Sequence, residues 1–297
     1  MIIGKKLLLT IWCCVLCIAC TQAQVDDTYM TTSDSAAFVN ANWNSEKMDG
    51  FVLKRHHFTH KQIFASNQNF CIIEVPVNSK KRLYFAYDTI LTETSVQAQR
   101  HKAVAAINGT FFDMDKGNPV CFLKIDTTIV GYNVPSKKDT VNRKYYQSGT
   151  IVLNNGKMNL IPSQPSRVWE ERLDFANMMT AGPLLIHKGQ SLEMRMDRTF
   201  VTARHNRTAI GLKKDGTLVM LVVDGRFKDK CEGLSLPELI QVMRWMGCTE
   251  AINLDGGGSS TLYINGYGSN GIVNYPSDNR KFDHDGERPV SNILYLK

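Results

Sequence analysis

Residues 253–262 read NLDGGGSSTL, in which one carboxylate is followed by three glycines, two serines and a threonine. A single Asp-Gly pair is enough for a tight turn, because glycine adopts positive φ at no steric cost. Three consecutive glycines lose more backbone entropy on folding than a turn requires. The run therefore indicates either that another group packs closely against the main chain, or that the backbone amides of Gly256, Gly257 and Gly258 act as hydrogen-bond donors.

The segments before this run predict a helix followed by a strand. Residues 235–247, SLPELIQVMRWMG, carry a capping box formed by Ser235 and Glu238, a proline in the first turn and Gly247 at the end. Residues 250–254, EAINL, then form an apolar run typical of a buried strand. This strand delivers Asp255 to its end.

The rest of the chain alternates predicted strands with glycine turns. Strands are predicted at CIIEVPV (71–77), LYFAYD (83–88) and RPVSNILYL (288–296), and a helix capped by Thr94 or Ser95 runs to Lys102. Hairpins are predicted at Asn155-Gly156, Lys188-Gly189 and Asp215-Gly216. This order predicts one α+β domain over residues 51–297, with a mixed, largely antiparallel β-sheet and a few packed helices.

The first 50 residues are predicted to lie outside this domain. Residues 1–23 combine Lys5 and Lys6 with an apolar stretch too short to span a bilayer, which is typical of a secretory signal. Two processing sites stay open: cleavage after Ala23, or lipidation of Cys20 in LCIAC, which resembles a bacterial lipobox. We expect an exported protein, periplasmic or at the cell surface, that contacts the membrane only through a lipid on Cys20. Residues 24–50 are rich in Thr, Ser, Asp and Asn, and predict a tether with room for a short helix.

Composition and charge narrow the classes of partner. The net charge is +7, but no basic run is interleaved with aromatic residues, so nucleic-acid binding is not predicted. The positive charge fits an anionic small substrate. No cofactor and no metal site are predicted: the histidines at 56, 57 and 60 and the acidic loop FDHDGERPV (282–290) are interpreted as solvated segments.

Four cysteines remain outside the signal segment, and their disulfide pairing is left open by the sequence. They are Cys71, Cys121, Cys231 and Cys248. No C-x-x-C pair occurs among them, so structural zinc is not predicted. A helix of about a dozen residues is roughly 18 Å long, which separates Cys231 from Cys248. We expect Cys248 to be a buried thiol at the end of the helix.

Polar residues gather where apolar strands begin or end. Such positions beside glycine turns are where rigid scaffolds present functional side chains. The groups are Asn108 and Thr110 after AVAAI, Arg207 and Thr208 before AIGL, Asp224 and Arg226 after LVMLVV, and Asp255, Ser259 and Ser260 after AINL.

Six motifs occur in an order that resembles the phosphodiester glycosidase domain family. They are AAINGTFFD, TAGPLL, RTAIG, VVDGR, AINLDGGGSSTL and ERPVSNILYL, and the resemblance covers roughly residues 70–297. It implies an enzyme that hydrolyses the bond between the anomeric carbon of an N-acetylglucosamine-like sugar and a phosphodiester. The implied partner is a glycan or sugar-phosphate substrate.

The resemblance and the strand-end residues together assign roles. The candidate catalytic carboxylates are Asp255, Asp224 and Glu287, and the candidate phosphate clamps are Arg207, Arg226 and Arg288. Gly256, Gly257 and Gly258, with Ser259 and Ser260, are predicted to form an anion-binding nest. Asn108, Gly109, Thr110, Thr208 and Asn253 complete the predicted substrate-binding set. Two alternatives stay open: a metal-dependent phosphodiesterase that attacks phosphorus, and a non-catalytic envelope module that binds phosphorylated glycans.

Overall fold

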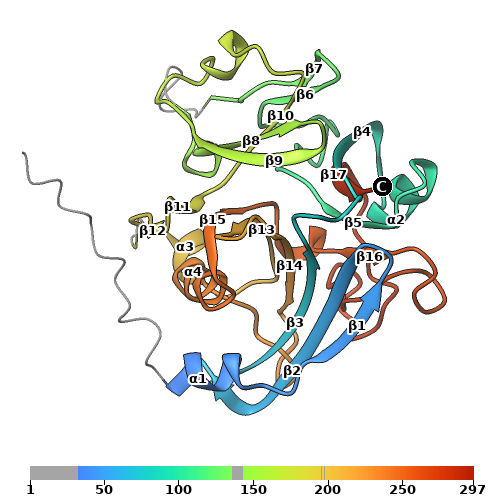
Figure 1. The fold of residues 1–297 in the computed structure, drawn as a ribbon, viewed down its shortest axis with the longest axis vertical. Helices are drawn as coiled ribbons and strands as arrows, with labels where there is room; N and C mark the ends of the chain where they lie inside the picture. Colours follow the sequence, from blue (N-terminus) through green and yellow to red (C-terminus); the bar gives the residue numbers. More distant parts are fainter. Residues whose placement is uncertain (1–32, 136–142, 195, 197) are drawn as a thin grey trace, which may run out of the picture.

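The computed structural model describes residues 33–135, 143–194, 196 and 198–297. Three antiparallel sheets form its framework (Figure 1). The largest sheet has eight strands in the order β1-β2-β3-β14-β13-β15-β11-β12. Their bounds are β1 Asn44–Met48, β2 Phe51–Ile63, β3 Ser66–Val75, β14 Leu218–Asp224, β13 Arg207–Lys213, β15 Cys248–Asn253, β11 Leu184–His187 and β12 Gln190–Ser191.

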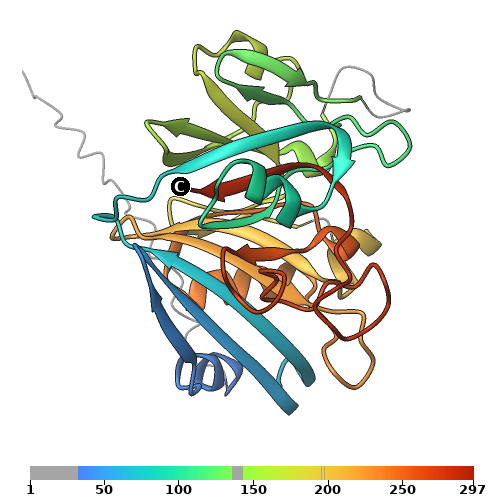
Figure 2. The ribbon, with the colours of Figure 1, turned by 90° about the vertical axis from the view of Figure 1, so that its right-hand side faces the viewer.

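The two smaller sheets come from the middle and the end of the chain. The five-stranded sheet has the order β7-β6-β10-β8-β9, with bounds Thr128–Gly131, Leu123–Ile125, Asn177–Ala181, Gly149–Asn154 and Lys157–Pro162. The four-stranded sheet has the order β16-β5-β17-β4, with bounds Leu262–Ile264, Ala105–Asn108, Val290–Leu296 and Leu83–Thr92. Figure 2 shows β4 and β17 lying between the other two sheets.

Helices cover one face of the eight-stranded sheet. They are α1 Ser33–Val39, α3 Thr199–Thr202 and α4 Leu236–Trp245, while α2 Thr94–Arg100 packs against the four-stranded sheet. β14 is buried on both faces: Met220 and Val222 face a core shared by all three sheets, and Val219 and Leu221 face the core beneath α1 and α4. This double burial explains the unbroken apolar run LVMLVV. Among the described residues, no helix has the length and apolar run that a membrane crossing requires.

The predicted α+β class and its largely antiparallel sheet are confirmed. The predicted hairpins are also confirmed, since β8 pairs with β9, β11 with β12 and β13 with β14. The turn residues Asn155 and Gly156 both adopt positive φ, as a two-residue hairpin requires. All four described cysteines are buried free thiols, as predicted for Cys248.

The predicted tether is wrong for residues 33–50. Helix α1 and strand β1 lie in this region, and β1 pairs with β2 at the edge of the large sheet. Phe38 is buried among the rings of Trp43, Phe58 and Phe70, so this polar segment is anchored by a few aromatic side chains. The predicted signal and residues 24–32 lie outside the described residues.

The capping box predicted for α4 is present and gives a test of the fold. Ser235 Oγ accepts a hydrogen bond from the backbone N–H of Glu238, and Glu238 Oε2 accepts one from the backbone N–H of Ser235 at 2.8 Å. We predict that Ser235→Ala lowers the free energy of unfolding in urea by about 1 kcal/mol. Ser269→Ala, a matched change at an exposed loop position, is expected to stay within about 0.5 kcal/mol of the parent protein. Equal effects of the two changes would contradict the capping role.

Candidate active site

Asp255 is held in place by the neighbouring four-stranded sheet. Its backbone N–H donates to the carbonyl of Gly109 at 3.0 Å, and its carbonyl accepts from Asn108 Nδ2 at 2.7 Å. Its carboxylate Oδ1 accepts from the backbone N–H of Gly256 at 2.9 Å. These contacts fix the main chain of Asp255, a residue that is only partly exposed.

Glycines allow two arginines to lie directly against the chain that follows Asp255. A Cβ atom on Gly257 would stand 2.6 Å from Nη2 of Arg226, and one on Gly258 would collide with the guanidinium of Arg288. A side chain at either position would force the neighbouring guanidinium to move, and Gly257 also has a φ of 62°, which a non-glycine residue rarely adopts. The close approach suggested by the sequence is therefore made by two cations of this same protein.

The amides of the glycine run are largely used inside the protein, which contradicts the predicted anion nest. Gly257 N donates to the carbonyl of Asn206, and the run turns as a short 3₁₀ helix, η4 Gly257–Ser259. The other bonds are Gly256 N to the Asp255 carboxylate, Ser259 N to Gly256 O and Ser260 N to Gly257 O. Positive charge at this place comes from side chains.

A cavity of about 350 Å³ opens beside these arginines. It is lined by Arg226, Phe227, Ser277, Asp278, Arg280 and Arg288. Asp278 is the only carboxylate among these six residues, and it accepts from Nε and Nη2 of Arg288. Three guanidinium groups against one carboxylate leave a surplus of positive charge, which suits an anion.

Arg226 is the cation best prepared to bind a ligand. Arg226 is exposed, and within the described part of the chain its guanidinium has no hydrogen-bond acceptor. Partial desolvation and the neighbouring charge of Arg288 lower the pKa of Arg226. Its backbone has a φ of 66°, a left-handed conformation that a non-glycine residue rarely adopts and that is typical of functional sites.

Arg207 does not join this cluster. Its side chain is buried and donates to the backbone carbonyls of Leu234, Ala203 and Phe200 at 2.8–3.1 Å. Burial lowers its pKa to about 10. The predicted phosphate clamp is therefore wrong for Arg207, which holds the segments around α3 and the start of α4.

Asp224 also has internal partners in place of the predicted catalytic role. It is fully buried at the end of β14, where it accepts from Asn69 Nδ2, Asn274 Nδ2 and the backbone N–H of Tyr275 at 2.7–3.0 Å. Burial raises its pKa to about 7, although the three donors oppose the shift. Asp224 anchors the start of the 274–288 loop, which carries Asp278, Arg280 and Arg288.

Glu287 acts as a cap for a helix. Its Oε2 accepts from the backbone N–H of Ser95 at 3.0 Å, in the first turn of α2. Burial raises its pKa, with the Ser95 hydrogen bonds opposing. The carboxylate thus satisfies a helix end, and its predicted catalytic role is not supported.

Three buried polar residues of the predicted substrate-binding set, Asn108, Thr208 and Ser260, form a hydrogen-bonded network, and Asn108 also binds the carbonyl of Asp255. Asn108 Oδ1 accepts from Thr208 Oγ1 at 2.7 Å, and Thr208 Oγ1 lies 3.1 Å from Ser260 Oγ. Members of the predicted set that are at most 1% exposed are Asn108, Thr110, Thr208, Asn253, Ser259 and Ser260. Because these residues are buried, they do not line the surface of the site. They connect the strand ends of different sheets and so position the site. Gly109 has a related role, because a Cβ there would collide with Asn292.

The pKa of the Asp255 carboxyl is raised by burial. The Ser259 side chain, the Gly256 amide and the positive charges of Arg288 and Arg226 act in the opposite direction. The arginines therefore help to keep a buried carboxyl ionised, which a base or nucleophile requires.

Sequence reasoning missed Tyr146, Lys144, Phe111 and Arg280. The Tyr146 ring packs 4.7 Å from that of Phe111, and Lys144 Nζ lies 5.5 Å from the Tyr146 ring centroid. Tyr146 and Lys144 belong to no motif. Their segment precedes β8 of the five-stranded sheet, so only the tertiary structure brings them to Asp255.

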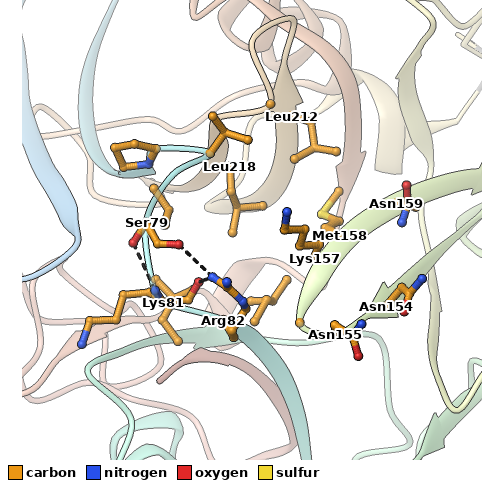
Figure 3. A pocket seen from close by; sticks show the side chains of 17 residues that line it. Ser79, Lys81, Arg82, Asn154, Asn155, Lys157, Met158, Asn159, Leu212 and Leu218 are labelled. Carbon is orange, nitrogen blue, oxygen red and sulfur yellow. Dashed lines mark hydrogen bonds between the residues drawn. The ribbon is translucent and has the colours of Figure 1, made fainter.

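A second cavity, of about 450 Å³, lies where the β3–β4 connection meets the β8–β9 and β13–β14 turns (Figure 3). The β3–β4 connection contributes two cationic side chains to this cavity, and both already have partners within the protein. Lys81 Nζ contacts Asp49 Oδ2 at 2.8 Å, and Arg82 Nη1 donates to the carbonyls of Ser79 and Lys81. We therefore place the candidate active site at the arginine-lined cavity. Within the described ranges, no three His, Cys, Asp or Glu residues are grouped closely enough to hold a metal ion.

Comparisons with known proteins identify the family of this chain. The model of the phosphodiester glycosidase family matches residues 101–297. The N-acetylglucosamine-1-phosphodiester alpha-N-acetylglucosaminidase of Mus musculus is 35% identical over 105 residues, which cover 33% of this chain and 19% of the mouse protein. The enzyme of the same name from Homo sapiens is 39% identical over 79 residues, covering 27% and 14%. The matched segments thus span less than a fifth of these relatives.

A solved structure shares the fold. The zebrafish N-acetylglucosamine-1-phosphodiester alpha-N-acetylglucosaminidase catalytic domain, auto-inhibited by its pro-peptide, aligns with a TM-score of 0.63 at 18% identity, over 86% of this chain and 87% of that one. This likeness extends to segments before residue 101, where the family model does not reach.

We predict that Arg226→Gln raises the pKa of Asp255, because it removes a positive charge that favours the carboxylate. The measurement is an NMR titration of ¹³C-labelled aspartate side chains, with the Asp255 signal assigned from Asp255→Asn. Arg100→Gln, which removes a charge from α2, serves as control. A titration of Asp255 that is identical in Arg226→Gln and the parent protein would rule out this electrostatic coupling.

Proposed function

Because this chain belongs to the phosphodiester glycosidase family, we propose that it cleaves the bond between the anomeric carbon of a sugar and a phosphodiester. The observation that carries the proposal is the cavity lined by Arg226, Arg280 and Arg288, two of which, Arg288 and Arg226, lie close enough to Asp255 for their charges to act on its pKa. Planar guanidinium groups match phosphate oxygens with two parallel hydrogen bonds. The arginines would hold the phosphate while Asp255 acts at the sugar.

One available carboxylate is enough for this reaction. A phosphate monoester, whose second pKa is about 6, is a weakly basic leaving group that needs little protonation by the enzyme. The bond to the anomeric carbon breaks, its electron pair stays on the phosphate oxygen, and water supplies the new hydroxyl. Asp255 activates that water or attacks the anomeric carbon itself. The internal bonding of Asp224 and Glu287 is consistent with a site that uses no separate acid.

The proposed sugar is N-acetylglucosamine or a close analogue. Support comes from the names of the relatives from Mus musculus and Homo sapiens, which share only a segment with this chain. Export and lipidation of Cys20 stay predictions, since residues 1–32 lie outside the described part of the chain.

Hydrolysis of an N-acetylglucosamine phosphodiester in ¹⁸O water tests the reaction. We predict that the phosphate monoester product carries no ¹⁸O by ³¹P NMR, because water adds to carbon. Asp255→Asn is expected to abolish turnover while keeping the thermal unfolding profile of the parent protein. Label in the phosphate would instead identify a phosphodiesterase, and absence of turnover would favour a binding module.

The arginine cluster gives a second prediction. Arg226→Ala should lower kcat/KM for the phosphodiester by roughly 10- to 150-fold, the equivalent of a charge-assisted hydrogen bond of about 1.5–3 kcal/mol. Arg288→Ala should act in the same direction, and Arg226→Lys should recover part of the loss because the charge is kept. A neutral aryl glycoside of the same sugar has no phosphate, so its hydrolysis should change far less. Equal losses on both substrates would remove these arginines from phosphate binding.

A further inference from the structure

A second group of side chains comes from the segment that precedes β8 and from the turn that follows β5. Tyr146 lies in the 3₁₀ turn η2 Tyr145–Gln147, just before β8. Its backbone packs against Gly182, where a Cβ would stand 3.0 Å from the carbonyl carbon of Tyr146. The carbonyl of Gly182 in turn accepts from Asn253 Nδ2 at 2.9 Å, at the end of the strand that delivers Asp255.

A second path of contacts leads from Tyr146 to Asp255. The Tyr146 ring packs on Phe111, which comes two residues after the Gly109 carbonyl that binds the Asp255 amide. Phe200 extends the aromatic surface, with its ring centroid 6.2 Å from that of Phe111. Burial raises the pKa of Tyr146, and the Asp255 charge contributes to the same shift, as its proximity requires.

The polar ends of this group are the Tyr146 hydroxyl and Lys144 Nζ, which lies over the Tyr146 ring. Among the described residues, the Tyr146 hydroxyl makes no hydrogen bond and Lys144 Nζ pairs with no carboxylate. A half-buried phenol usually finds a partner for its hydroxyl. Here the hydroxyl and the ammonium stand beside aromatic rings, and such a surface offers both an apolar face and polar contacts.

A buried ion pair fixes the segment that carries these residues. Both terminal nitrogens of Arg143 donate to Glu170, whose side chain is fully buried, and Asn133 Nδ2 donates to the same carboxylate. Gln147 Nε2 donates to the carbonyl of Val120 at 2.7 Å. A segment bonded in this way is pre-organised, so a ligand that binds it does not have to order it.

We propose that Tyr146, Phe111 and Lys144 form the sugar subsite, distinct from the arginine-lined phosphate subsite. The aromatic rings pack on the apolar face of the pyranose, while the Tyr146 hydroxyl and Lys144 Nζ bind its oxygens. The segment before β8 and the turn after β5 are then the elements that select the sugar. This inference rests on the proposed function, since it assigns one half of the same substrate.

The test measures binding of the two halves separately, by NMR titration with free N-acetylglucosamine and with inorganic phosphate. Tyr146→Ala should weaken sugar binding by about 10-fold or more and leave phosphate binding within about 2-fold of the parent protein. Arg226→Ala should show the reverse pattern. Tyr132→Ala, at an exposed tyrosine just after β7, is the matched control and should change neither.

A milder variant covers the case in which Tyr146→Ala does not fold. Tyr146→Phe keeps the ring and loses one neutral hydrogen bond, so sugar binding should weaken by about 3- to 10-fold. Sugar affinity that is unchanged in the folded Tyr146 variants, or a parent protein that does not bind N-acetylglucosamine, overturns the subsite. Sugar binding that depends on Tyr146 without any hydrolysis would overturn the glycosidase and keep the subsite.

Discussion

The close approach of two guanidinium groups to a bare main chain organises the candidate site. Arg226 and Arg288 occupy the space that side chains on Gly257 and Gly258 would fill. Their charges help keep the half-buried Asp255 ionised, and the run itself stays compact through its own hydrogen bonds. This close contact thus determines where the two arginines lie, favours the ionised form of the Asp255 carboxyl and shapes the cavity. A Cβ at either glycine would displace an arginine and disturb all three.

Residues that do not reach the cavity surface still determine it. Asp224 ties Asn274 and Tyr275 to the end of β14, and the loop that begins there supplies four of the six residues that line the cavity. Asn108 binds the carbonyl of Asp255 and accepts from Thr208 across two sheets. These groups are buried and fully engaged, so their removal would leave unsatisfied partners in the interior. The site is therefore built in two layers, a polar network below and charged side chains above.

Local patterns in the sequence predicted the elements that depend on local physics. The capping box at Ser235, the Asn155-Gly156 turn and the strand that ends at Asp255 follow from backbone preferences, and all are present. Local patterns could not separate structural from functional polar residues, because Arg207 and Arg226 both lie at strand ends. Only the tertiary structure shows that carbonyls surround the first and a cavity faces the second. The sequence around Tyr146 carries no motif, because its position near Asp255 depends on how the sheets pack together. The polar composition of residues 33–50 likewise hid the burial of Phe38.

Under the proposed phosphate-binding role, the left-handed backbone at Arg226 places stability and turnover in competition. A non-glycine residue in this conformation costs on the order of 1 kcal/mol, and glycine would relieve the cost. Selection for heat resistance alone would therefore favour glycine at this position, whereas selection for activity would retain arginine. Screening the same variants at position 226 once for heat resistance and once for activity would separate these two selective pressures. A thermostabilised variant of this protein that stays active would therefore have to keep arginine at position 226.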